Sequence, residues 1–165
     1  MLYEIQHLSG GHDKNNFDCG VAGKNEFLRR FASQNAKKGI GRTFVAVLPP
    51  DISHIYGYYT LASGSVRFDN LPVANLPRYP VPTVNLAKLA IDKSAQGRGL
   101  GSALLFDALE RTAKIAEDLG VFAVEVKALD DAAKKFYLKY GFAAMLDDPM
   151  HLYLPIKNAK ALFGL

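Results

Sequence analysis

Apolar residues recur at helical spacing in three parts of the chain and predict three helices. We expect these helices over residues 25–38, 100–119 and 131–139, with Gly120 ending the second. The apolar positions of the first helix fall on one face, and they are Phe27, Leu28, Phe31 and Ala32. Each helix is therefore expected to pack one face against another layer of structure.

Five runs of β-branched and apolar residues predict strands. They cover residues 43–48, 55–63, 83–91, 121–128 and 151–156. The segment Pro-Pro-Asp-Ile-Ser between the first two strands suits a hairpin connection. The run at 83–91 is apolar on both faces, as a central strand should be. The order α, β, β, β, α, β, α, β then predicts a mixed sheet with helices on its faces.

Composition narrows the class of protein. The 165 residues are 49% hydrophobic and 22% charged, which suffices for one buried core, so we expect a single domain over residues 1–165. No apolar run approaches the roughly 18 residues that cross a membrane, and the N-terminus lacks the pattern of a secretory signal. Cys19 is the single cysteine, and the four histidines lack metal-ligand spacing. We expect a reduced, cytoplasmic protein without a metal and without membrane association.

The positive charge is concentrated in one segment. The chain has a net charge of +4, whereas residues 24–42 carry six basic side chains against Glu26 alone. A solvated helix face would explain this segment. A docking surface for a polyanion such as RNA would explain it equally well.

Residues 66–82 contain four prolines and little periodicity, which predicts a long loop. Loops of this length in compact domains are more often functional than idle. A surface loop without a function is the alternative.

A glycine-rich turn, residues 96–101 (QGRGLG), follows the buried strand and opens the second helix. Glycines let the backbone approach a ligand closely, and the N–H groups and dipole at a helix start favour phosphate. Arg98 can add a charge-assisted contact. The spacing fits neither the dinucleotide fingerprint G-x-G-x-x-G nor the Walker loop. A tight strand-to-helix turn without a ligand is the other interpretation.

This turn resembles the Q/R-x-x-G-x-G/A pyrophosphate loop of the GNAT acetyltransferases. Residues 133–142 (AKKFYLKYGF) resemble the A-x-x-F-Y…G-F segment of that family. Further segments resemble the GNAT toxins of bacterial toxin–antitoxin pairs, and they are residues 17–20 (FDCG), 25–32 (NEFLRRFA), 57–61 (GYYTL), 77–82 (PRYPVP), 89–92 (LAID) and 147–149 (DDP). The resemblance implies an α/β (α+β) architecture, the GNAT fold, with a central mixed and mostly antiparallel sheet flanked by helices.

The resemblance also implies acetyl transfer from acetyl-CoA to an amine, without a metal. The backbone expected to pair with the pantetheine arm is that of Leu89, Ala90 and Ile91. The residues expected to hold the pyrophosphate are Gln96, Gly97, Arg98, Gly99, Leu100, Gly101 and Ser102. Gln96 would act either as a side-chain contact or as a turn residue.

Tyr137 matches the tyrosine of the A-x-x-F-Y segment, so we expect it to protonate the departing thiolate as a general acid. The alternative is a core aromatic, the interpretation we adopt for Phe136. Asp130 departs from the asparagine of many family members, which puts one pantetheine contact in doubt. Glu125 and Asp92 lack a distinctive pattern, so no general base is assigned.

For the toxin subgroup the implied substrate is the α-amine of aminoacyl-tRNA, whose acetylation blocks translation. The implied partners are a ribbon-helix-helix antitoxin and a second copy of the chain in a homodimer. The side chains expected to contact RNA are Arg29, Arg30, Lys37, Lys38, Arg42 and Arg78. An acidic antitoxin tail would suit the same charges.

Two other functions compete. An N-acetyltransferase of protein or small-molecule amines would work without RNA and tolerate charge reversal at Arg29 and Arg30. A non-catalytic CoA-binding regulatory module would bind acetyl-CoA and be indifferent to Tyr137→Phe. A pure nucleic-acid-binding protein would leave the glycine-rich turn unexplained.

Overall fold

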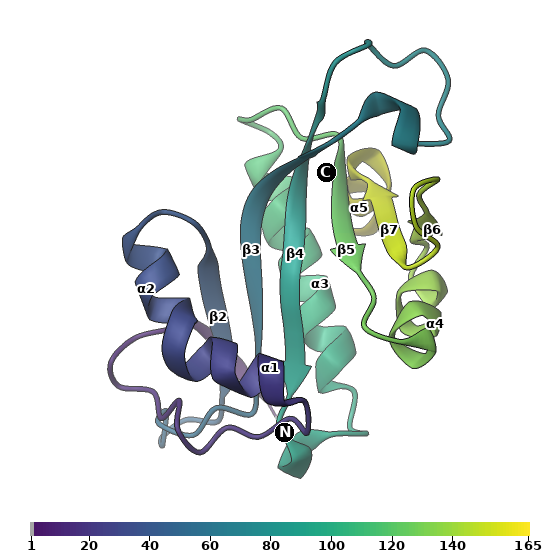
Figure 1. Cartoon of the computed structure of the whole chain (residues 1–165). Coiled ribbons are helices and arrows are strands. Elements are labelled where there is room, and N and C mark those ends of the chain that lie inside the picture. The colour runs from purple at the N-terminus through teal and green to yellow at the C-terminus, as the bar shows by residue number, and fades with distance from the viewer. Residues whose placement is uncertain (1) are drawn as a thin grey trace. The chain divides into compact units, whose positions relative to one another are not determined.

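The computed structural model describes residues 2–165 (Figure 1). The chain divides into two compact units. The first comprises the residues up to Ala62 together with Ala87–Ala108, and the second comprises Ser63–Leu86 and Leu109–Leu165. Because each unit takes segments from both halves of the chain, neither corresponds to a continuous stretch of sequence. The expectation of one domain stays a prediction.

The strands are hydrogen-bonded in the order β1-β2-β3-β4-β5-β7-β6. Their bounds are β1 Glu4–His7, β2 Arg42–Val47, β3 Gly57–Val66, β4 Val81–Ile91, β5 Ala123–Lys127, β6 Ala143–Ala144 and β7 His151–Pro155. The pair β4–β5 is parallel, whereas β1–β2, β2–β3, β5–β7 and β6–β7 are antiparallel. This pattern confirms the predicted mixed, mostly antiparallel sheet. All five predicted strands are present, with ends shifted by a few residues.

The helical segments are α1 Ala22–Glu26, the π-helical η1 Phe27–Phe31, α2 Ala32–Lys37, η2 Phe68–Asn70, η3 Lys93–Ala95, α3 Leu100–Ile115, α4 Asp131–Lys139 and α5 Ile156–Leu162. The predicted bounds of α4 are confirmed. The predicted extension of α3 to residue 119 is wrong, because the helix ends at Ile115 and Leu119 is 62% exposed. Two end elements, β1 and α5, were not predicted.

The predicted regular helix over residues 25–38 is also wrong in detail. It begins at Ala22 and contains a wide π turn, in which the Ala32 N–H donates to the Phe27 carbonyl oxygen. Leu28 and Ala32 are buried, but Phe31, which was expected on the same apolar face, is 42% exposed. The extra residue in the π turn explains this displacement of Phe31.

Adjacent tyrosines of β3 define the two faces of the sheet in the first unit. Tyr58 stacks on Phe27 and donates to the Lys24 carbonyl oxygen, so α1 and η1 cover its face. Tyr59 donates to the carboxylate of Asp107 in α3, on the opposite face. Since side chains alternate along a strand, helices cover both faces of the sheet in this unit (Figure 1).

In the second unit the proline-rich loop is anchored at its start. Leu71 is 3% exposed within a core cluster that includes Val66, Val81 and Tyr153. The tip of the loop, residues 77–80, is exposed. The loop is therefore fixed at its base and presents its tip to solvent. In the described part of the chain, residues 2–165, no helix is long and apolar enough to span a bilayer.

Candidate active site

The glycine-rich turn joins β4 to α3 and needs two of its glycines for their backbone conformation. Gly97 has φ of +77° and Gly99 has φ of +82°, in the left-handed region that favours glycine. A Cβ built at either position would meet nothing within 4 Å. Gly101 lies in the first turn of α3. The alternation of the three glycines thus reflects two turn positions and one helix-start position.

The side chain of Gln96 holds the glycine-rich turn in place through two hydrogen bonds. Its side-chain amide donates to the carbonyl oxygens of Ile91, at 2.9 Å, and Cys19, at 3.0 Å. These bonds link the turn to the end of β4 and to the loop that precedes α1. They favour the turn-residue interpretation of Gln96 over a direct ligand contact.

Asp92 fixes the same junction with a buried carboxylate. One oxygen accepts the Asp18 N–H at 2.9 Å, and the other accepts the Ser94 N–H and hydroxyl at 3.1 and 2.6 Å. Burial alone would raise the pKa of Asp92, but these hydrogen bonds outweigh it and hold the pKa below its usual range. Asp92 is therefore ionised at neutral pH and hydrogen-bonded through both oxygens, so it is a poor candidate for a general base.

The end of β4 is closely packed on one side. A Cβ built on Gly57 would lie 3.2 Å from the Ala90 carbonyl oxygen and 2.9 Å from Leu104, so a larger residue there would force these neighbours to shift. The Leu89 carbonyl oxygen accepts a 3.0 Å hydrogen bond from the Lys24 ammonium, and that of Ile91 accepts the Gln96 amide. Because a carbonyl oxygen has two lone pairs, each keeps capacity for a second donor. Pairing of this backbone with pantetheine stays a prediction.

Tyr137 is held in the second unit by α4 and the chain that follows it. Asp130 is the N-cap of α4, and its carboxylate accepts the Ala133 N–H at 2.8 Å. Tyr137 is 6% exposed, with the rings of Phe136 and Phe142 at centroid distances of 5.2 and 5.4 Å. Burial raises the pKa of the Tyr137 phenol. The phenol therefore keeps its proton throughout the neutral pH range.

The second candidate base, Glu125, belongs to a polar group within the second unit. Its carboxylate accepts the Thr83 hydroxyl at 2.9 Å and lies 3.9 Å from His151 Nε2. The Nδ1 of His151 lies 3.1 Å from the Asp147 carboxylate. Sequence reasoning could not connect these residues, because they come from separate strands and a loop. The hydrogen bond from Thr83 orients Glu125, and no role in proton transfer is assigned to it.

The predicted RNA contacts lie in different places. Arg29 and Arg30 are exposed on η1, with Arg30 paired to Glu26 at 2.9 Å. Lys38 is exposed at the end of α2. Arg78 is exposed at the tip of the proline-rich loop, where it helps to line a cavity of about 210 Å³ in the second unit.

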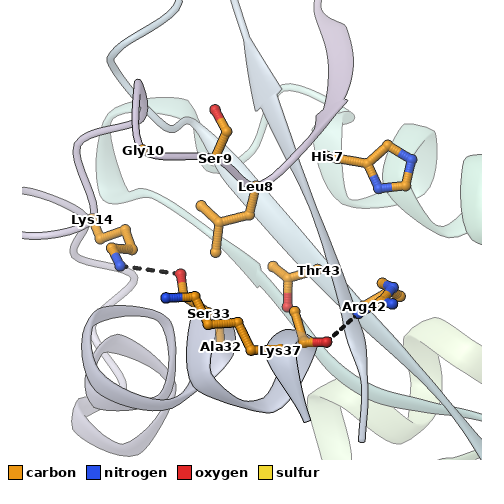
Figure 2. A pocket seen from close by; sticks show the side chains of 11 residues that line it. His7, Leu8, Ser9, Gly10, Lys14, Ala32, Ser33, Lys37, Arg42 and Thr43 are labelled. Atoms are coloured by element: carbon orange, nitrogen blue, oxygen red, sulfur yellow. Dashed lines mark hydrogen bonds between the residues drawn. The ribbon is translucent and has the colours of Figure 1, made fainter. Parts of the chain in front are cut away.

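Lys37 and Arg42 line a common cavity of about 400 Å³ in the first unit. Lys14, which sequence reasoning missed, lines it as well (Figure 2). No motif around Lys14 could have indicated this contact, because α2 and the segment containing Lys14 meet only in the folded chain.

Comparisons with known proteins agree with this architecture. Residues 51–144 match the family described as the acetyltransferase (GNAT) domain. The chain is 39% identical over 162 residues to the tRNA-acetylating toxin of Mycobacterium tuberculosis, covering 96% of this chain and 95% of that protein. The chain belongs to the GNAT acetyltransferase family, which confirms the predicted fold class and the predicted acetyltransferase chemistry.

Two solved structures extend the likeness. AtaT complexed with acetyl-methionyl-tRNAfMet matches with a TM-score of 0.90 and 28% identity, over 98% of this chain and 99% of that chain. A mutant AtaT toxin bound to acetyl-CoA and to the C-terminus of the antitoxin AtaR matches with a TM-score of 0.85 and 26% identity, over 99% of both chains. The resemblance to the GNAT toxins therefore extends over nearly the whole chain.

Proposed function

We propose that this protein is an acetyl-CoA-dependent N-acetyltransferase toxin that acetylates the α-amine of aminoacyl-tRNA and thereby blocks translation. The observation that carries the proposal is 39% identity to a tRNA-acetylating toxin over 96% of the chain. The turn between β4 and α3, whose glycines Gly97 and Gly99 have positive φ, supports the binding of acetyl-CoA without reference to any similar protein.

The residues around the turn fit acetyl-CoA. The open space beside Gly97 and Gly99 leaves room for a ligand close to the backbone, and the start of a 16-residue helix favours a pyrophosphate. In the proposal, Gly97, Arg98, Gly99, Leu100, Gly101 and Ser102 hold the pyrophosphate, and Leu89, Ala90 and Ile91 pair through their backbone with the pantetheine. Gln96 positions this turn through its bonds to Cys19 and Ile91.

The proposed reaction is a single acyl transfer to which acetyl-CoA contributes the thioester. The neutral α-amine forms a C–N bond with the acetyl carbon, and the C–S bond breaks. Tyr137 donates its phenolic proton to the departing sulfur and regains a proton from the amine nitrogen. The products are an amide and a free thiol. The raised pKa of Tyr137 keeps this proton in place before each turnover.

No dedicated general base is required. A free α-amine titrates at about 7.7–8.0, so an appreciable fraction is already neutral at physiological pH. The hydrogen bonds that engage Asp92 argue against its recruitment as a base.

The basic side chains are proposed to hold RNA phosphates through sequence-independent electrostatics. They are Arg29, Arg30, Lys37, Lys38, Arg42 and Arg78. Arg29 and Arg30 lie on exposed turns of η1, where a phosphate backbone can reach them. In this proposal the protein acts in the cytoplasm, where charged tRNA is found.

The proposed regulation is neutralisation by an antitoxin of the ribbon-helix-helix class, whose tail covers the toxin. The AtaT complex with the C-terminus of AtaR supports the participation of an antitoxin tail. A homodimer is proposed by analogy with the toxin subgroup.

The test is transfer of labelled acetyl from acetyl-CoA to total charged tRNA. Label is expected on charged tRNA and not on deacylated tRNA, and Tyr137→Phe is expected to lower the rate at least about tenfold while acetyl-CoA still binds. Tyr140→Phe is the matched control, because it removes a phenol from the end of the same helix. Absence of label on charged tRNA, with label on free protein or small-molecule amines, would overturn the substrate assignment.

A further inference from the structure

The cavity of about 400 Å³ in the first unit lies apart from the glycine-rich turn. It is lined by the end of β1 and the following loop, by α2, and by the start of β2. Figure 2 shows Leu8 and Thr43 between Lys14 on one side and Arg42 on the other. Leu8 and Ala32 give the cavity an apolar part, and its charged part is entirely cationic.

Three cationic side chains line this cavity, Lys14, Lys37 and Arg42, and its lining contains no aspartate or glutamate. Because these three positive charges repel one another, an anionic ligand bound in the cavity would relieve the repulsion. An ordinary solvated helix face would not bring Lys14, which precedes α1, into contact with the α2 residue Ser33.

Two of these cations are held in place and keep unused donors. The Lys14 ammonium donates to the Ser33 hydroxyl at 3.1 Å, which uses one of its three N–H donors. The Arg42 guanidinium donates to the Ala36 carbonyl oxygen near the end of α2. A guanidinium has five N–H donors in a fixed fork, so most of them stay available for an anion.

The loop that forms one wall of the cavity is fixed by hydrogen bonds around the buried side chain of His12. His12 is 6% exposed, and its Nδ1 accepts the Ser9 N–H at 3.0 Å. Its Nε2 lies 2.9 Å from the Gln6 side-chain oxygen, to which it donates when Nδ1 is the acceptor. The Asp13 N–H donates to the Ser53 carbonyl oxygen at 2.7 Å. The wall is therefore organised before any ligand arrives, as in most specific binding sites.

We propose that this cavity is a phosphate-binding site in which Lys14, Lys37 and Arg42 hold one phosphate group. A phosphate offers several acceptor oxygens with spread negative charge, which suits one guanidinium and two ammonium groups. The phosphate comes either from the backbone of the RNA substrate or from a free phosphorylated compound. The assignment of the phosphate to RNA rests on the proposed function. The proposal that the cavity binds a phosphate group does not depend on it.

The first arm of the test measures binding of inorganic phosphate by phosphorus NMR line broadening. The protein is saturated with CoA, so that the glycine-rich turn is already occupied. The Lys14→Gln/Arg42→Gln variant is compared with wild type and with Lys157→Gln/Lys160→Gln, a control that removes the same charge from α5. Saturable broadening is expected in wild type and the control, with affinity lowered at least about tenfold in the cavity variant.

Lys37→Gln is the second variant, because Lys37 is exposed and its loss disturbs no buried packing. It is expected to weaken phosphate binding in the same direction. Thermal unfolding of each variant identifies any that fail to fold.

The second arm measures KM for charged tRNA with the same proteins. A rise of about tenfold in KM at unchanged kcat, confined to the cavity variants, assigns the site to an RNA phosphate. Lost phosphate binding with unchanged KM supports the site and assigns it to a free phosphorylated compound. If the cavity variants match the control in both arms, the proposal is overturned. If wild type fails to acetylate tRNA, the first arm still decides whether the cavity binds phosphate.

Discussion

The side-chain amide of Gln96 donates to the carbonyl oxygen of Cys19 at 3.0 Å, across 77 positions of the chain. Gln96→Glu replaces this donor with a carboxylate facing two carbonyl oxygens, those of Cys19 and Ile91. We expect the turn to lose its fixed position and KM for acetyl-CoA to rise by roughly tenfold, since each lost hydrogen bond costs about 1 kcal/mol. Steady-state kinetics with varied acetyl-CoA measures this effect.

Asn158→Asp is the control for Gln96→Glu, because it makes the same amide-to-carboxylate change on an exposed position of α5. Its KM for acetyl-CoA is expected to equal that of wild type. Equal KM values for both variants would show that Gln96 does not position the turn.

Asp130 is expected to stabilise α4 as its N-cap. Asp130→Ala removes the acceptor for the Ala133 N–H and should lower the free energy of unfolding by about 1 kcal/mol. Asp130→Asn keeps an acceptor oxygen at the same position and should be nearly neutral. Chemical denaturation measures the free energy of unfolding of the two variants. An equal decrease in both would mean that the negative charge of Asp130 matters more than its hydrogen bond to the Ala133 N–H.

The pH dependence of acetyl transfer should report the substrate amine and not Tyr137. Burial raises the pKa of Tyr137 above its ordinary value of 10.0, so the phenol stays protonated across the working range. We expect kcat to rise as the α-amine loses its proton near pH 7.7–8.0, with no decline up to about pH 9. A decline below that pH in wild type that disappears in Tyr137→Phe would contradict the assignment.

His12 should make stability depend on pH. Burial lowers the pKa of His12 below 6.5, and a hydrogen bond with the Ser9 backbone offsets only part of that effect. As the pH falls below 6.5, the unfolded chain takes up a proton at this position before the folded chain does, so the free energy of unfolding decreases. The stability contributed by neutral His12 is fully present above that pH.

We expect His12→Gln to flatten this dependence by up to about 1.4 kcal/mol per pH unit in that window. Denaturant titrations at a series of pH values measure the slope. Asp92 does not contribute to the slope in this window, because its lowered pKa changes stability only at more acidic pH, around and below 3.8. An unchanged slope in His12→Gln would assign the pH dependence to another group.

The sequence alone predicts elements whose signals are local. The bounds of α4 follow from the helical run over residues 131–139 and from Gly141 after it, and the structure adds Asp130 as the cap of its first turn. The β2–β3 hairpin follows from two β-branched runs around Pro-Pro-Asp-Ile-Ser. The glycine-rich turn is visible in the sequence as alternating glycines between a strand and a helix, and the structure shows that two of them, Gly97 and Gly99, have positive φ.

Features that depend on contacts distant in sequence could not be predicted in this way. The edge strand β1 is short and mostly polar, and it exists because Glu4–His7 pairs with Phe44–Val47. The π turn in η1 widens a helix whose periodicity looks regular. The C-terminal helix α5 has only seven residues, of which Ala159 is buried. Lys14 joins Lys37 and Arg42 only through the folding of the first unit.

The central claim is that the acetyl group goes to the α-amine of aminoacyl-tRNA. The most direct measurement is mass spectrometry of the terminal nucleoside released by nuclease from charged tRNA, after incubation with acetyl-CoA and wild-type protein or Tyr137→Phe. The proposal predicts an acetylated aminoacyl-adenosine with wild type and at least about tenfold less with the variant. An unmodified aminoacyl-adenosine with wild type, while acetyl-CoA still binds, would contradict it.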